Sequence, residues 1–183
     1  MIFTATNVAG VWIVDPEKLS DERGLFYRTF CHDEFAAHGL NPAVVQGNVS
    51  FNTHRGTLRG LHSQRPPWEE AKLVRCSRGA IYDVALDLRP NSPSYLKHAA
   101  ATLTAENGRM LFVPEGVYHG FLTLEDNSEV HYQMSQYYHP DSSVGVRWDD
   151  PAFGIQWPEP VCMISERDKS FPDFAPLSAG ARE

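Results

Sequence analysis

The sequence has few cysteines, no excess of positive charge and no long apolar run. Its three cysteines, Cys31, Cys76 and Cys162, lack C-x-x-C spacing and are odd in number, a pattern typical of reduced thiols in a cytoplasmic protein. A net charge of −7 argues against a nucleic-acid groove and against a polybasic membrane surface. No stretch approaches the roughly 20 apolar residues of a membrane span, and the N-terminus lacks a signal-peptide pattern. We therefore expect a cytoplasmic protein that binds neither nucleic acid nor membrane.

Two further absences concern chemistry and architecture. No G-x-G-x-x-G segment occurs, so the usual fingerprint of a nicotinamide dinucleotide site is missing. No long helical pattern alternates with strands, which argues against a parallel α/β sheet. The 183 residues, 42% of them hydrophobic, are enough to bury one core. Because we find no repeat or linker, we expect residues 1–183 to form a single domain.

What the sequence does contain is a series of short apolar or alternating runs, about one every ten residues. Residues such as proline, glycine and asparagine separate these runs. Many short strands with turn residues between them predict an all-β sandwich or barrel. One short helix is predicted over 33–38, and the tail from Pro158 is expected to be irregular. The predicted strands are 11–14, 25–30, 44–52, 57–62, 71–76, 80–88, 98–103, 110–113, 120–124, 130–137 and 144–148.

Four polar side chains fall on these predicted strands, and a fifth, His119, directly precedes one. The four are Arg59, His62, Lys72 and Tyr132. Each alone has an ordinary structural explanation, such as a hydrogen-bonded structural histidine or a lysine that snorkels from a strand end. Together they are too many for an apolar interior. If they face the same way, the barrel has a polar lumen, and a polar lumen in a small barrel is most simply a ligand site.

A metal site is the next possibility. Gly108 to His119 fits the second cupin motif, G-x5-P-x-G-x2-H, and Gly56 to His62 fits the opening of the first. The first motif should continue H-x-H, but the chain has His62-Ser63-Gln64. Two histidines and Glu69 would make only a weak site, and Lys72 would repel a cation. We expect no metal and no cofactor.

A set of ordered motifs covers almost the whole chain, and through them the sequence resembles the dTDP-4-dehydrorhamnose 3,5-epimerase family. One such motif would be weak evidence, but this many in the right order are specific. The matching segments include Asp21-Glu22-Arg23-Gly24-x-Phe26, Gln46-x-Asn48-x-Ser50, Arg59-Gly60-Leu61-His62-x-Gln64, Ala71-Lys72-Leu73-Val74-Arg75, Pro114-Glu115-Gly116-x-x-His119-Gly120-Phe121, Trp148-x-Asp150-Pro151 and Ser165-x-x-Asp168.

The resemblance implies a cupin jelly roll (a double-stranded β-helix), a homodimer and a nucleotide-diphosphate sugar inside the barrel. The family's base matches His62, and the carboxylate that orients the base matches Asp168. The family's acid matches Tyr132, and the cation beside the substrate oxygen matches Lys72. The remaining matches concern substrate binding. They are the second histidine, His119; the diphosphate-binding Arg59 and, from the partner subunit, Arg23; the channel residues Gln46 and Asn48; Phe26; and Arg28, which lies near the nucleotide base.

The chemistry of a 4-keto-6-deoxy sugar agrees with these assignments. Its C3 and C5 hydrogens are alpha to the carbonyl, so removing one gives an enolate, and reprotonation on the opposite face inverts the carbon. Histidine is a suitable base near neutral pH, and a carboxylate on its far nitrogen fixes the tautomer. A fixed cation meets the developing oxyanion, and a phenol donates from the other face. Guanidinium groups suit the diphosphate.

Three positions depart from the family pattern: Arg28 replaces a common Glu, Ser63 a Tyr and Tyr118 an Ala. Neutral drift explains them equally well. The alternative is changed specificity, with Arg28 near the base, Ser63 opening space beside His62 and Tyr118 filling space beside His119. The enzyme would then invert only C3 or only C5, or act on a GDP- or CDP-linked sugar. A non-catalytic sugar-binding cupin, a metal cupin and a 3,4-ketoisomerase are the competing functions.

Overall fold

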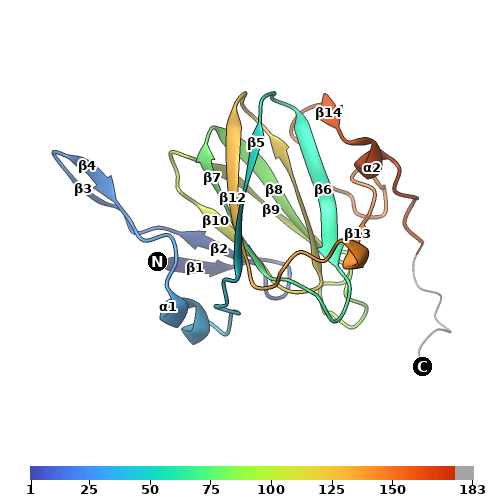
Figure 1. Cartoon of the computed structure of the whole chain (residues 1–183), viewed down its shortest axis with the longest axis horizontal. Coiled ribbons are helices and arrows are strands. Elements are labelled where there is room, and N and C mark those ends of the chain that lie inside the picture. Colours follow the sequence, from blue (N-terminus) through green and yellow to red (C-terminus); the bar gives the residue numbers. More distant parts are fainter. Residues whose placement is uncertain (176–183) are drawn as a thin grey trace.

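The computed structural model of the chain describes residues 1–175, which fold into two sheets packed face to face (Figure 1). All pairings are antiparallel except that of β14 with β6. We call the two sheets sheet I and sheet II. In spatial order, sheet I contains β1 (Ile2–Ala5), β2 (Trp12–Asp15), β10 (Met110–Val113), β7 (Lys72–Arg78), β12 (Ser128–Met134) and β5 (Gln46–Asn52). Sheet II contains β13 (Ser143–Gly145), β6 (Thr57–Gln64), β11 (Val117–Thr123), β8 (Ala80–Asp87) and β9 (His98–Thr104), and β14 (Met163–Ile164) pairs with β6.

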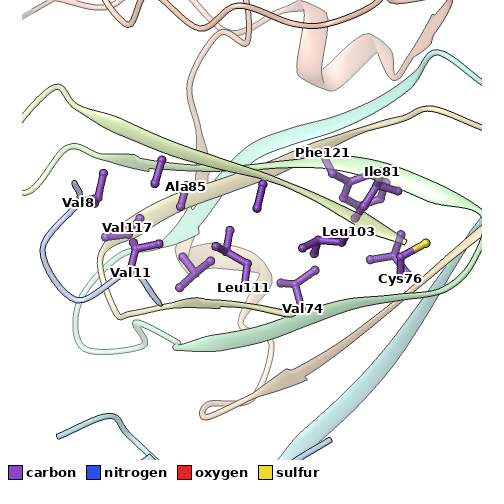
Figure 2. Packing of buried hydrophobic residues seen from close by; sticks show 14 residues of the cluster. Val8, Val11, Val74, Cys76, Ile81, Ala85, Leu103, Leu111, Val117 and Phe121 are labelled. Carbon is purple, nitrogen blue, oxygen red and sulfur yellow. The ribbon is translucent and has the colours of Figure 1, made fainter. Parts of the chain in front are cut away.

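The main core lies between the two sheets. Figure 2 shows Val74 and Leu111 of sheet I packed against Ile81 and Leu103 of sheet II. Side chains alternate along each strand, so Leu73 points to the other face of sheet I. There it joins a second cluster beneath α1 (His32–Ala37). Apolar and polar side chains follow one another along the inward faces of these strands: on β11, for example, His119 lies between the core residues Val117 and Phe121.

This architecture confirms the predicted all-β jelly roll with short helices. Most strands from residue 46 onward lie within a few residues of their predicted positions. The predicted strand over 25–30 is wrong: β3 (Leu19–Asp21) and β4 (Gly24–Phe26) form a short hairpin that projects from the barrel (Figure 1). The turn signals around Arg23 close this hairpin before the aromatic run that suggested a longer strand. No helix within residues 1–175 has the length and apolarity needed to span a membrane.

The tail is more regular than predicted. After the short 3-10 helix η1 (Pro140–Ser142), the chain forms β13, runs across sheet II and returns as β14 and α2 (Glu166–Lys169). Two-residue strands and one-turn helices leave almost no periodic signal, because they are shorter than the pattern used to recognise them. Pairing with β6 is what orders this segment.

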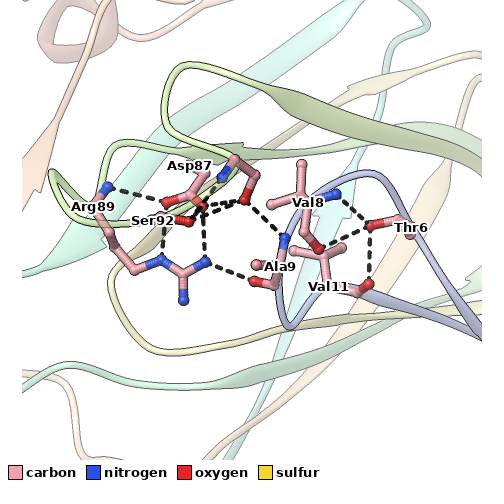
Figure 3. A network of polar contacts seen from close by, with 8 residues as sticks. Thr6, Val8, Ala9, Val11, Asp87, Arg89 and Ser92 are labelled. Atoms are coloured by element: carbon pink, nitrogen blue, oxygen red, sulfur yellow. Dashed lines mark hydrogen bonds and ion pairs between the residues drawn. The ribbon is translucent and has the colours of Figure 1, made fainter.

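A buried polar network ties the loop after β8 to the N-terminal turn (Figure 3). Asp87 is fully buried and accepts hydrogen bonds from Arg89, Ser92 and Ser94. Arg89 also donates to the Ala9 carbonyl oxygen at 2.6 Å. Two segments about 80 residues apart in the sequence are thereby joined.

Candidate active site

The barrel contains two cavities of about 360 and 180 Å³ that share part of their lining. Both are lined by His62, Lys72 and Tyr132. The smaller, deeper one adds Arg59, His119 and Phe121. The larger adds Gln46, Asn48, Ser63, Gln64, Glu70, Met134, Tyr138, Ser143 and Arg167. Nearly all the polar side chains that the sequence placed on strands therefore surround these two cavities.

An irregularity in β6 brings Arg59 and His62 to the same side. Residues three apart on a regular strand point to opposite faces. Here His62 pairs with His119 and Arg59 pairs with Phe121, so three steps on β6 match two steps on β11. This extra residue is a β-bulge, and it turns both side chains into the cavity.

Glycine at the bulge is required by contact as well as by backbone conformation. Gly60 has φ of +130°, and a Cβ there would lie 2.5 Å from the Gly120 Cα. A Cβ on Gly120 would in turn lie 2.8 Å from the Arg59 carbonyl oxygen. The pair lets β6 and β11 approach closely, which holds Arg59, His62 and His119 in one layer.

The tail supplies a carboxylate to His62. Its Nε2 lies 2.6 Å from Asp168 Oδ1. Asp168 is the third residue of α2, and its backbone N–H donates to the side chain of the N-cap Ser165, the usual use of a Ser-x-x-Asp sequence. Burial opposes ionisation of Asp168, but the hydrogen bonds from His62 and the Gly60 N–H hold its pKa below the ordinary value. The pair therefore combines an imidazole with an ionised, buried carboxylate.

Sheet I presents Lys72 and Tyr132 across the cavity from His62. Lys72 Nζ lies 2.8 Å from Glu70 Oε1, with both side chains largely buried. Tyr132 is half-buried, and burial raises the pKa of its phenol although the positive charge of Arg59 lowers it. The hydroxyl therefore stays protonated at neutral pH. An imidazole on one sheet thus faces a protonated phenol on the other.

Two further polar pairs complete the deep cavity. His119 Nε2 lies 2.8 Å from Asp83 Oδ1, and Asp83 is fully buried. Arg59 donates from Nε to the amide oxygen of Asn52 at 2.7 Å. The sequence analysis did not identify Glu70, Asp83 or Asn52. Glu69, considered only as a weak metal ligand, lines neither cavity, and two adjacent glutamates give no sign of which faces inward.

Three predicted substrate-binding residues lie outside both cavities. Arg23 and Phe26 belong to the projecting hairpin, where Phe26 is 71% exposed. Arg28 follows the hairpin and pairs with Glu34 of α1 at 2.6 Å. Within one subunit, none of the three reaches the space lined by His62.

Of the departures from the family pattern, Ser63 lines the larger cavity but Tyr118 does not. The expectation that Tyr118 fills space beside His119 is wrong, because successive residues of β11 point to opposite faces. Tyr118 instead packs on the outer side of sheet II against a cluster that includes Leu61, Leu86 and Phe153. Burial there raises the pKa of its phenol.

As for metals, the described residues 1–175 contain no group of three His, Cys, Asp or Glu side chains arranged to hold an ion. The two histidines of the cavity, His62 and His119, each have a carboxylate as the hydrogen-bond partner of Nε2.

Comparisons with known proteins identify the family of the chain. The family model described as dTDP-4-dehydrorhamnose 3,5-epimerase matches residues 5–176. The enzyme of that name from Methanothermobacter thermautotrophicus is 45% identical over 172 residues, covering 92% of each chain.

Solved structures show the same fold. The dTDP-4-dehydrorhamnose 3,5-epimerase from Elizabethkingia anophelis superposes with a TM-score of 0.92 at 36% identity, covering 95% of this chain and 96% of that one. The Bacillus anthracis enzyme, solved with TDP and pyrophosphate bound, has a TM-score of 0.90 at 36% identity, covering 94% and 99%. The chain belongs to the dTDP-4-dehydrorhamnose 3,5-epimerase family.

Proposed function

We propose that the protein is a cofactor-independent epimerase that inverts C3 and C5 of dTDP-4-dehydro-6-deoxyglucose through an enolate. The observation that carries the proposal is the placement of His62 and Tyr132 on opposite sheets around one cavity. Inversion at carbon requires a proton to leave one face and return to the other, and two proton carriers facing each other supply that path. The close relatives named for this reaction support the choice of substrate.

Each group then has a chemical role. His62 removes the proton from carbon, while Asp168 orients the imidazole and stabilises its protonated form. The ammonium of Lys72 stabilises the developing enolate oxygen in a site shielded from water. Tyr132 donates to the opposite face. His119 contacts the sugar, Arg59 binds the diphosphate, and Gln46 and Asn48 line the entrance.

We further propose that the enzyme is a cytoplasmic homodimer in which Arg23 and Phe26 of one subunit complete the site of the other. The hairpin that carries them projects from the barrel and exposes Leu19, Leu25 and Phe26. Exposed apolar side chains on a projecting element are typical of an interface between subunits. A guanidinium group delivered in this way would join Arg59 at the diphosphate. The free thiols of Cys31, Cys76 and Cys162 fit a cytoplasmic location.

Solvent deuterium exchange tests the assignment. Wild-type protein incubated with dTDP-4-dehydro-6-deoxyglucose in D₂O should introduce deuterium at both C3 and C5. His62→Asn should abolish the exchange while leaving thermal unfolding unchanged within about 3 °C, because the imidazole is partly exposed and asparagine keeps an N–H donor for Asp168. Tight binding without exchange in the wild type would identify a binding protein instead. Exchange at one carbon only would identify a mono-epimerase.

A further inference from the structure

The two cavities are lined by more basic side chains than carboxylates. Arg59, Lys72 and Arg167 contribute cations, and His62 and His119 contribute imidazoles. Among the described residues 1–175, Glu70 is the one carboxylate in either lining. A diphosphate entering this space meets three cations of similar strength, so charge alone does not decide which of them it contacts.

The basic side chains of the two cavities fall into two groups, according to whether their polar partner is a carboxylate or a neutral oxygen. Three nitrogen groups each contact a buried carboxylate. Lys72 contacts Glu70, which is 5% exposed, and His62 contacts Asp168, which is 3% exposed. His119 contacts Asp83, which is 0% exposed. The two guanidinium groups contact neutral oxygens instead. Arg59 donates to the Asn52 amide at 2.7 Å, and Arg167 donates to the Ser143 hydroxyl at 2.8 Å. The charge of each guanidinium group is therefore not balanced by a carboxylate, whereas the charge of Lys72 is balanced by Glu70.

Glu70 is well placed to make this difference. Its Oε1 lies 2.8 Å from Lys72 Nζ, and its buried Oε2 has no hydrogen-bond partner among the described residues. The carboxylate is thus committed to the ammonium and to nothing else. A lysine side chain has four rotatable bonds and strongly hydrated charge. Without an anion beside it, Lys72 would compete with Arg59 for phosphate oxygens.

We propose that Glu70 is a positioning residue, which determines the side chains that the diphosphate and the sugar of the substrate contact. By neutralising and holding Lys72, it directs the diphosphate to Arg59 and Arg167 and reserves the ammonium for the sugar oxygen. This inference rests on the proposed function for the identity of the sugar, but its electrostatic part concerns any diphosphate. The residue acts through Lys72 and not by contact with the reacting carbon.

Binding of inorganic pyrophosphate, measured by titration calorimetry without turnover, tests the electrostatic part. Glu70→Gln keeps the shape of the side chain and removes its charge, so pyrophosphate should bind about tenfold more tightly. The matched control is Glu69→Gln, which removes the same charge one residue away, outside both linings. It should change the affinity less than about twofold. Unchanged or weaker binding by Glu70→Gln would overturn the proposal.

A charge-balanced double variant keeps the test decisive if Glu70→Gln alone fails to fold. Lys72→Met should weaken pyrophosphate binding because it leaves Glu70 negative, and adding Glu70→Gln should restore affinity to within about threefold of the wild type. If the diphosphate normally contacts Lys72, the double variant will instead bind as weakly as Lys72→Met. That result would also overturn the proposal.

Turnover separates this inference from the proposed function. In Glu70→Gln, kcat should fall about tenfold or more with no rise in KM, because the substrate binds more tightly but in the wrong position. A merely structural role would raise KM or lower thermal stability instead. If the wild type shows no epimerisation, the function is wrong, yet the pyrophosphate measurements still decide whether Glu70 sets the charge of the site.

Discussion

At the scale of single residues, the phenol of Tyr132 can be separated from substrate binding. Burial raises its pKa above the ordinary value near 10, so the hydroxyl keeps its proton through neutral and mildly alkaline pH. Tyr132→Phe removes the proton donor and keeps the ring. We expect kcat to fall about 10²- to 10⁴-fold, with dTDP affinity within about threefold of the wild type. Steady-state kinetics and calorimetry give the two numbers, and a parallel loss of both would contradict a role in proton donation.

Asp168 should affect turnover through His62, to which it is hydrogen-bonded. Its pKa is lowered, so the carboxylate stays ionised down to pH values below about 4. Asp168→Asn keeps the shape but offers the imidazole a neutral partner, and we expect kcat to fall about 10³-fold. Because its pKa is lowered, Asp168 should not set the acid limb of the wild-type pH profile. Glu166→Gln, on the same helix turn but exposed, is the control and should leave kcat unchanged.

At the scale of elements, the bulge in β6 depends on Gly60. Gly60→Ala places a Cβ 2.5 Å from the Gly120 Cα, at a φ of +130°. Gly24 is a matched control, because its φ of +124° is similar but its added Cβ meets nothing within 4 Å. Gly24→Ala should lose about 1–2 kcal/mol of unfolding free energy. Gly60→Ala should lose at least about 2 kcal/mol more, measured by urea denaturation, and equal losses would show that the close approach is unimportant.

The same elements show what the sequence could and could not predict. Regular strands such as β10 were predicted at their observed bounds, because four apolar residues between turn signals admit few alternatives. The bulge was not predicted, because an unpaired residue depends on the partner strand and leaves no local pattern. Asp168 was identified only through resemblance. Glu70 and Asp83 were missed because their importance comes from the nitrogen atoms that the fold places beside them.

At the scale of the whole molecule, the network around Asp87 should govern acid stability. Burial alone would raise its pKa, but hydrogen bonds from Arg89, Ser92 and Ser94 lower it from 3.8 to about 2. A lowered pKa stabilises the folded state above pH 4, and this contribution, about 2 kcal/mol, disappears as the pH falls toward 2. Asp87→Asn should therefore be less stable than the wild type at pH 7, and the difference should shrink at pH 2.5.

Urea denaturation at the two pH values measures this difference. Glu22→Gln, a change at an exposed residue of the projecting hairpin, is the control and should shift the free energy of unfolding by less than about 0.5 kcal/mol at pH 7. A stability gap for Asp87→Asn that stays constant with pH would mean that the carboxylate contributes through packing and not through its charge.

The proposed dimer predicts complementation between two inactive variants. Arg23→Ala lacks the guanidinium lent to the partner, and His62→Asn lacks the base. In a mixed dimer, the subunit that keeps His62 receives an intact Arg23, so one site of two is complete. Equal amounts, unfolded and refolded together, should regain about a quarter of wild-type activity. No recovery, despite mixed dimers detected by native mass spectrometry, would place Arg23 outside the partner's site.

The parallel pairing of β14 with β6 has a consequence for how activity arises during synthesis. Every barrel strand up to β13 precedes residue 146, whereas the carboxylate that serves His62 lies beyond residue 160. As the chain leaves the ribosome, the barrel can close around its lumen before that carboxylate has emerged. At that stage the nascent protein has a formed cavity, but His62 has no carboxylate partner. His62 gains its carboxylate partner only when α2 docks on the strand that carries His62.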